Sequence, residues 1–177
     1  MIAYRPLKAH EIARVGEIDR TERIDRVYLQ RGTELAVVEG DFSSPPWQPE
    51  GHGEYSVAHQ VGECERWVEA GGIALGAFEG ERLVGMGIVV PHLRPGVAQL
   101  AFLHVSDGFR NRGIGRHLND ELDAIARATG DTTMVVSATP SVNTVDFYRR
   151  RGYAPTASPL PELLEREPKD VHLEKPL

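Results

Sequence analysis

Hydrophobic positions in this 177-residue chain follow two spacings, one typical of helices and one typical of strands. Helical spacing places apolar residues on one face of segments near Ile12–Ile18, Glu54–Ala70 and Leu118–Ala126. Short apolar runs bounded by glycine, proline or charged residues predict the strands. These runs are 1–5, 24–29, 34–39, 73–78, 83–90, 99–105, 133–138, 153–156 and 170–175.

Turn-forming residues indicate how these elements connect. The clearest antiparallel hairpin joins Ile73–Phe78 to Leu83–Val90 through Glu79-Gly80-Glu81-Arg82, and a shorter one is predicted within Ile24–Glu39. The prolines at 91 and 95 predict a turn over His92–Gly96. Residues 41–53 are rich in serine, proline and glycine, which predicts a loop. Helical turns are expected over 141–151 and 162–167.

A basic segment that contains two glycines separates the 99–105 strand from the next helix. It reads Arg110-Asn111-Arg112-Gly113-Ile114-Gly115-Arg116. Arginines at a helix start face the positive end of the helix dipole, so a bound anion is the simplest compensation. Glycine lets backbone N–H groups approach that anion, and the first N–H groups of a helix lack an intrahelical acceptor. The segment therefore predicts an anion site. It lacks the Gly-Lys-Ser/Thr of a P-loop, and Leu118 stands where a dinucleotide fingerprint needs glycine.

Two motifs in sequence order carry a resemblance to a known family. Arg110-x-x-Gly113-x-Gly115 resembles the pyrophosphate-binding signature of the GNAT superfamily, the acyl-coenzyme A-dependent N-acyltransferases. The second motif lies about 30 residues later and combines Ser141, Phe147-Tyr148 and Gly152-Tyr153 at the spacings typical of that superfamily. The specific resemblance covers 99–153, and the length of the chain fits one domain over 1–177.

The resemblance implies an α/β (α+β) fold with a mixed, mostly antiparallel central sheet, two splayed parallel strands and flanking helices. It also implies that acetyl-coenzyme A is the cosubstrate, with its pyrophosphate on the basic segment and its pantetheine along the backbone of the preceding strand. The position usually held by asparagine is Ser141 here, so Ser141 and Asn143 stay open as alternatives, and Ser141 also reads as a helix N-cap. The predicted cofactor-binding residues are Leu103, His104, Val105, Arg110, Asn111, Arg112, Gly113, Ile114, Gly115, Arg116, Ser141 and Asn143.

The implied reaction is direct attack of a primary amine on the thioester. By motif position, Tyr148 is the catalytic residue that protonates the leaving thiolate, although a tyrosine beside Phe147 also suits a core. No general base is evident, because Gln99 is not titratable and strand alternation puts His104 on the opposite face unless a bulge intervenes. Trp47 in the 41–53 loop is a candidate wall for the acceptor, with packing of that loop as the alternative.

Composition narrows the function further. A net charge of −6 argues against sequence-independent nucleic-acid binding. No membrane-spanning run or signal segment is evident, so a cytoplasmic location is expected. The single cysteine, Cys64, falls on the apolar stripe of its helix, which disfavours an acyl-cysteine route. His52, His59 and Glu63 fit solvated surface better than a metal site, and no metal is expected.

Some questions stay open at this stage. The sequence does not identify the amine acceptor, and fold membership does not decide it. The resemblance also allows a homodimer. A non-catalytic acyl-coenzyme A sensor or interaction module is the alternative to an enzyme, because no general base stands out.

Overall fold

A seven-stranded sheet forms the centre of the computed structural model, which describes residues 1–177. The strand order is β1-β4-β5-β6-β7-β9-β8, and β2 and β3 form a separate two-stranded ribbon. Every pair in the large sheet is antiparallel except β6 with β7. The strands are β1 (Ile2–Pro6), β2 (Arg26–Arg31), β3 (Glu34–Glu39), β4 (Ile73–Glu79), β5 (Arg82–Arg94), β6 (Val97–Val105), β7 (Thr133–Ala138), β8 (Ala154–Pro155) and β9 (Val171–Pro176).

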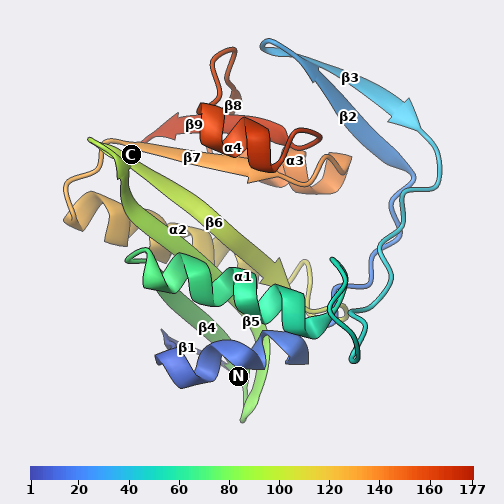
Figure 1. The fold of residues 1–177 in the computed structure, drawn as a ribbon, viewed down its shortest axis with the longest axis vertical. Coiled ribbons are helices and arrows are strands. Elements are labelled where there is room, and N and C mark those ends of the chain that lie inside the picture. The colour runs from blue at the N-terminus through green and yellow to red at the C-terminus, as the bar shows by residue number, and fades with distance from the viewer.

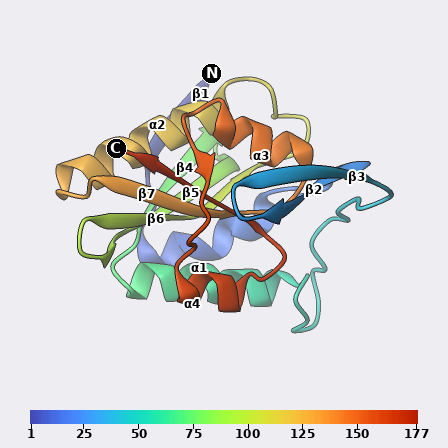
Figure 2. The ribbon, with the colours of Figure 1, turned by 90° about the horizontal axis from the view of Figure 1, so that it is seen from above.

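Helices cover both faces of this sheet, so its central strands are buried on both sides (Figure 1, Figure 2). Helices α2 and α3 lie on one face, and η1, α1 and α4 lie on the other (Figure 2). The helices are the 3-10 helix η1 (Ala9–Glu17) and the α-helices α1 (Val57–Glu69), α2 (Ile114–Ala128), α3 (Val142–Arg149) and α4 (Pro161–Arg166). None of them is long and apolar enough to cross a membrane.

Each face of the sheet has its own apolar core. The core under α2 includes Leu118 and Leu122, and the core under α1 and η1 includes Cys64 and Met86. Glycine at position 87 lets α2 pack closely, because an added Cβ there would lie 2.6 Å from Leu122 Cδ1. Cys64 is fully buried, and burial raises the pKa of its thiol to about 12, so the thiolate needed for an acyl-cysteine route is disfavoured.

The parallel pair β6 and β7 separates soon after it begins. Only Val97, Ala98 and Gln99 pair with β7, which leaves the rest of β6 without a partner on that side. Figure 1 shows the two strands starting close together and diverging toward their C-terminal ends. The predicted splay of two parallel strands is therefore confirmed, and it exposes polar backbone groups in the middle of the sheet.

A β-bulge in β6 changes which side chains share a face. Ile88 pairs with Phe102 and Val89 with Leu100, so Ala101 is an extra residue in β6. As a result Leu100 packs in the core under α2, while Phe102 packs in the core under α1. Because Ala98 and Leu100 both pack in the core under α2, Gln99 points to the other face, and the bulge puts Phe102 and His104 on that face with it. The Phe102 and His104 rings stack there with centroids 4.8 Å apart. Regular alternation would have placed His104 opposite Gln99, and the bulge reverses that expectation.

Most predicted elements match the structure, but the turn predicted over His92–Gly96 is confined to Pro95 and Gly96. Strand β5 continues through Pro91 to Arg94, and Arg94 pairs with Val97 across a tight turn. Proline is tolerated there because the register is irregular between Val90 and Arg94. His92 adopts a positive φ of 54°, and both its backbone N–H and its ring contact the buried Asp131 carboxylate.

The β2–β3 ribbon is confirmed where the sequence predicts a hairpin, and it stands at one side of the molecule (Figure 1). Two side chains of β2 attach it to the body. The Tyr28 hydroxyl donates to Asp146 of α3, and the Gln30 amide donates to the backbone oxygens of Thr156 and His172. The ribbon therefore borders the end of the sheet at which α3 begins.

Candidate active site

The turn between β6 and α2 presents a row of free backbone N–H groups. Asn111 and Gly113 have positive φ values of 61° and 81°, and Gly113 is the N-cap of α2. The N–H groups of residues 111–116 donate no hydrogen bond within the chain. The core anchors the turn, because the Ile114 side chain is 1% exposed and packs beneath α2. This arrangement fits an anion such as a pyrophosphate.

The three arginines of this turn have different surroundings. Arg110 donates to the backbone oxygens of Val105 at 3.1 Å and Thr21 at 2.8 Å, so it braces the turn against β6 and the segment after η1. Arg112 lies over the Phe109 ring at 4.9 Å and is exposed. Arg116 is exposed and lies 3.6 Å from Asp120, one helical turn ahead. Arg112 and Arg116 are therefore the arginines whose charges face solvent at the turn.

The unpaired edge of β6 supplies the next part of the site. Ser106 N–H donates to Val84 in β5, so backbone alternation turns the polar groups of Leu103 and the N–H of Val105 toward the gap beside β7. The side chains of Leu103 and Val105 pack against the core under α2. These two residues thus offer backbone groups to a ligand, while their side chains are structural.

Helix α3 begins and ends with residues that the motif singles out. Ser141 is 1% exposed and caps α3, because its Oγ accepts from Thr144 N–H at 3.1 Å and donates to the Thr144 hydroxyl at 2.8 Å. Asn143 is exposed. Tyr148 is 5% exposed, and its ring meets those of Phe147 and Tyr153 edge-on.

The phenol of Tyr148 has no hydrogen-bond partner, and burial together with the charge of Asp170 raises its pKa above the ordinary value. Tyr148 therefore keeps its proton at neutral pH and is able to donate it.

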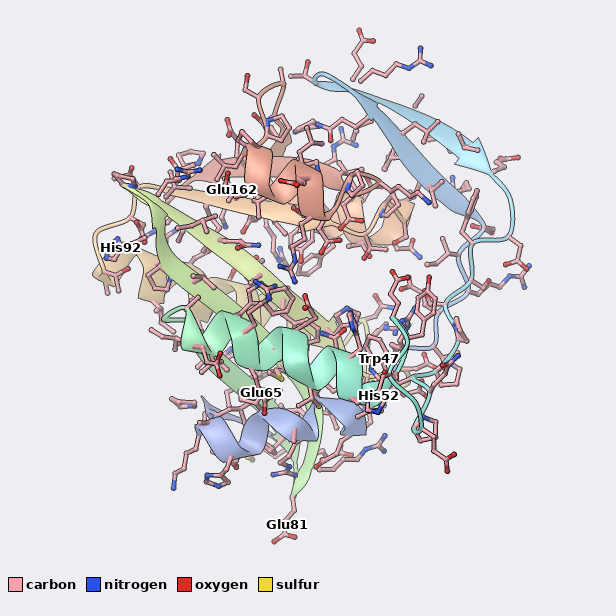
Figure 3. All side chains as sticks on the ribbon, in the orientation of Figure 1. Trp47, His52, Glu65, Glu81, His92 and Glu162 are labelled. Atoms are coloured by element: carbon pink, nitrogen blue, oxygen red, sulfur yellow. The ribbon has the colours of Figure 1, made fainter.

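Aromatic and basic side chains gather around His104 near the end of β6. The Trp47 and His104 rings lie 6.3 Å apart, and the Arg20 guanidinium lies over Trp47 at 4.4 Å and over Tyr55 at 5.0 Å. In Figure 3, Trp47 lies beside the N-terminal end of α1, on the side where β6 and β7 diverge. Burial, with Arg20 and Arg110 nearby, lowers the pKa of His104 to about 4. His104 is thus neutral at physiological pH.

One part of this site has no counterpart among the sequence predictions. Ser137 of β7 and His172 of β9 pair in the antiparallel register, and Ser137 Oγ lies 3.2 Å from His172 Nδ1. His172 Nε2 donates to the backbone oxygen of Glu167 at 3.1 Å, which leaves Nδ1 to accept from Ser137. These two hydrogen bonds hold the turn between α4 and β9 next to the end of β7. That turn carries Glu167 and Asp170. In the sequence, the only sign of this part of the site is the charged residue Asp170, which stands just before the last strand.

The family of the chain follows from a sequence comparison. The profile of the Acetyltransferase (GNAT) family matches residues 36–153, which is more than half of the chain. The chain belongs to that family. It is an acetyltransferase, and its cosubstrate is acetyl-coenzyme A. No curated protein sequence matches it.

Solved structures share the fold at low sequence identity. A nourseothricin acetyltransferase superimposes with a TM-score of 0.72 and 16% identity over 99% of this chain and 98% of its own. A Bacillus anthracis str. Ames protein, provisionally described as a streptothricin acetyltransferase and solved with acetyl coenzyme A, gives 0.70 and 14% over 100% and 98%. The PaiA N-acetyltransferase of Thermoplasma acidophilum, solved with coenzyme A, gives 0.63 and 16% over 100% and 99%. These likenesses agree with the mixed, mostly antiparallel sheet described above.

Proposed function

We propose that this enzyme transfers the acetyl group of acetyl-coenzyme A directly to a primary amine, and that Tyr148 protonates the leaving thiolate. The observation that carries the proposal is a protonated, unpartnered phenol that packs in the same core as Val136 and Ala138 of β7, the strand that diverges from β6. The row of free N–H groups over residues 111–116 and the open edge of β6 support binding of the cosubstrate at the gap between these two strands.

The assignment of cosubstrate contacts follows from which groups are free. Backbone N–H groups of residues 111–116, with Arg112 and Arg116, would hold the pyrophosphate, and the backbone of Leu103–Val105 would bind the pantetheine amides. Arg110 would act by bracing the turn, because its guanidinium already donates to two carbonyl oxygens. Of the two α3 candidates, exposed Asn143 is the better side-chain donor, since the Ser141 hydroxyl is occupied as a cap.

The chemistry requires two kinds of help. The amine nitrogen must be neutral to attack the thioester carbonyl, and negative charge that develops on sulfur must be stabilised as the C–S bond breaks. The Tyr148 phenol can supply the second through a hydrogen bond that becomes a proton transfer during bond cleavage. Cys64 takes no part in the proposal, because it is buried under α1 and keeps its proton.

The test compares Tyr148→Phe with Tyr153→Phe. Tyr153 is a matched control because it lies in the same aromatic stack and has a buried hydroxyl without a partner. Calorimetry measures acetyl-coenzyme A binding, and a thiol-release assay measures turnover with a panel of amines. Nourseothricin enters first, since a structurally similar enzyme is named for it. We expect Tyr148→Phe to lower kcat about 100-fold or more, the usual size of such a proton transfer, without weakening cosubstrate binding.

Two other outcomes would count against the proposal. Equal kcat for wild type and Tyr148→Phe would remove Tyr148 from the mechanism. Binding of acetyl-coenzyme A with no thiol release for any amine would instead favour an acyl-coenzyme A sensor or interaction module.

A further inference from the structure

We infer that Asp170 is the general base of the reaction, taking the proton that the acceptor ammonium must lose before attack. The inference rests on the proposed function, because it assigns the step that Tyr148 does not perform. It places the base on the turn between α4 and β9, rather than on β6, where Gln99 is not titratable and His104 is neutral and only weakly basic.

The fold brings Asp170 to the open end of the gap. Val171 pairs with Ala138, the last residue of β7, so Asp170 stands just beyond the C-terminal end of that strand. This is the end at which β6 and β7 are farthest apart, and Figure 1 shows the red turn between α4 and β9 there. Asp170 N–H donates to the Glu167 backbone oxygen at 3.2 Å, and the same oxygen accepts from His172, so the turn is held in place.

Val171, the residue after Asp170, packs in the same core as Tyr148, and neither the Asp170 carboxylate nor the Tyr148 hydroxyl makes a hydrogen bond within the chain. The charge of Asp170 raises the pKa of the Tyr148 phenol, and the Tyr148 side chain is more than nine-tenths buried. The Asp170 carboxylate is half-buried and makes no hydrogen bond or ion pair. An unpaired carboxylate beside an unpaired buried phenol leaves an acceptor and a donor for a third, bound group.

The charges around Asp170 favour a basic carboxylate and a cationic acceptor. Burial and the nearby Glu167 raise the pKa of Asp170 to about 7. Glu167 in turn faces Glu54 and Glu63, with Arg66 and Arg166 as the neighbouring cations. Both arginines pair with Glu63 and lower the pKa of Glu167 only in part, and neither forms an ion pair with Glu167 or Asp170. A base with a pKa near the operating pH is the most effective for this step.

Protons balance as follows. The ammonium loses one proton to Asp170, and the resulting neutral nitrogen forms the C–N bond with the thioester carbon. When the C–S bond breaks, the thiolate takes the proton of Tyr148, and the second proton of the attacking nitrogen restores Tyr148. Asp170 then gives its proton to solvent, so the products are the acetylated amine, coenzyme A and one proton.

The test measures pH profiles for wild type, Asp170→Asn, Asp170→Glu and Glu165→Gln. Glu165→Gln is the matched control because Glu165 is an exposed acid on neighbouring α4. The acceptor probes are nourseothricin and, as an unhindered amine, n-butylamine at high concentration. For wild type we expect kcat/KM to rise with pH up to about 7, as Asp170 loses its proton. Asp170→Asn should lower kcat about 100-fold or more and abolish that rise.

The controls separate a base from other roles. Asp170→Glu should recover part of kcat, and Glu165→Gln should match wild type. A raised KM with unchanged kcat in Asp170→Asn would make Asp170 a binding group and overturn the inference, as would an unchanged pH profile. If wild type binds acetyl-coenzyme A but acetylates neither probe and no amine of the panel, the proposed function fails and the assignment of Asp170 fails with it.

Discussion

Loss of one partner of the buried ion pair between Lys175 of β9 and Asp123 of α2 should destabilise the fold strongly. Their side chains are only 7% and 6% exposed, and Asn119 donates a second hydrogen bond to the same carboxylate oxygen at 3.0 Å. Lys175→Met would leave the Asp123 carboxylate buried without its cation. Removal of one partner of a buried pair costs about 3–5 kcal/mol, a large share of a total stability of about 5–15 kcal/mol.

Chemical unfolding followed by circular dichroism measures this loss of free energy. In thermal unfolding, the melting temperature of Lys175→Met should fall by about 10 °C. The double substitution Lys175→Met with Asp123→Leu removes both charges and should regain most of the loss, because an apolar pair needs no hydration. Lys169→Met removes an exposed lysine just before β9 and should leave stability unchanged. A loss below about 1 kcal/mol for Lys175→Met would refute the reasoning, because exposed pairs contribute that little.

Two further sites test the cosubstrate turn and helix α3. At Gly113, the substitutions Gly113→Asp and Gly113→Asn carry similar backbone strain, because φ is 81° there, and they differ in charge. Calorimetry should find the affinity for acetyl-coenzyme A about tenfold lower for Gly113→Asp than for Gly113→Asn, because the negative charge lies near the pyrophosphate. Equal affinities would contradict that placement. Ser141→Ala removes the α3 cap and should cost about 1 kcal/mol in chemical unfolding while cosubstrate affinity is retained, whereas a selective loss of affinity would make Ser141 a ligand contact.

Local sequence determined much of this protein. Apolar spacing and turn residues predicted the hairpin of β4 and β5, the ribbon of β2 and β3, and the helices around the sheet. Such features depend on neighbours within a few residues, so one stretch of chain contains the information. The motifs at Arg110–Arg116 and Ser141–Tyr153 likewise identified the family and its cosubstrate. The roles of the individual site residues stay predictions.

Tertiary structure decided what depends on register and on contacts between distant segments. The bulge at Ala101 moves His104 to the face of Trp47, and alternation along β6 cannot reveal it because pairing with β5 creates it. The charge of Asp170 acts on Tyr148 only because β9 pairs with β7 and the Ser137–His172 contact holds the preceding turn. Local propensity carries no information about such pairings, since their energy comes from strands and side chains that meet only in the folded chain.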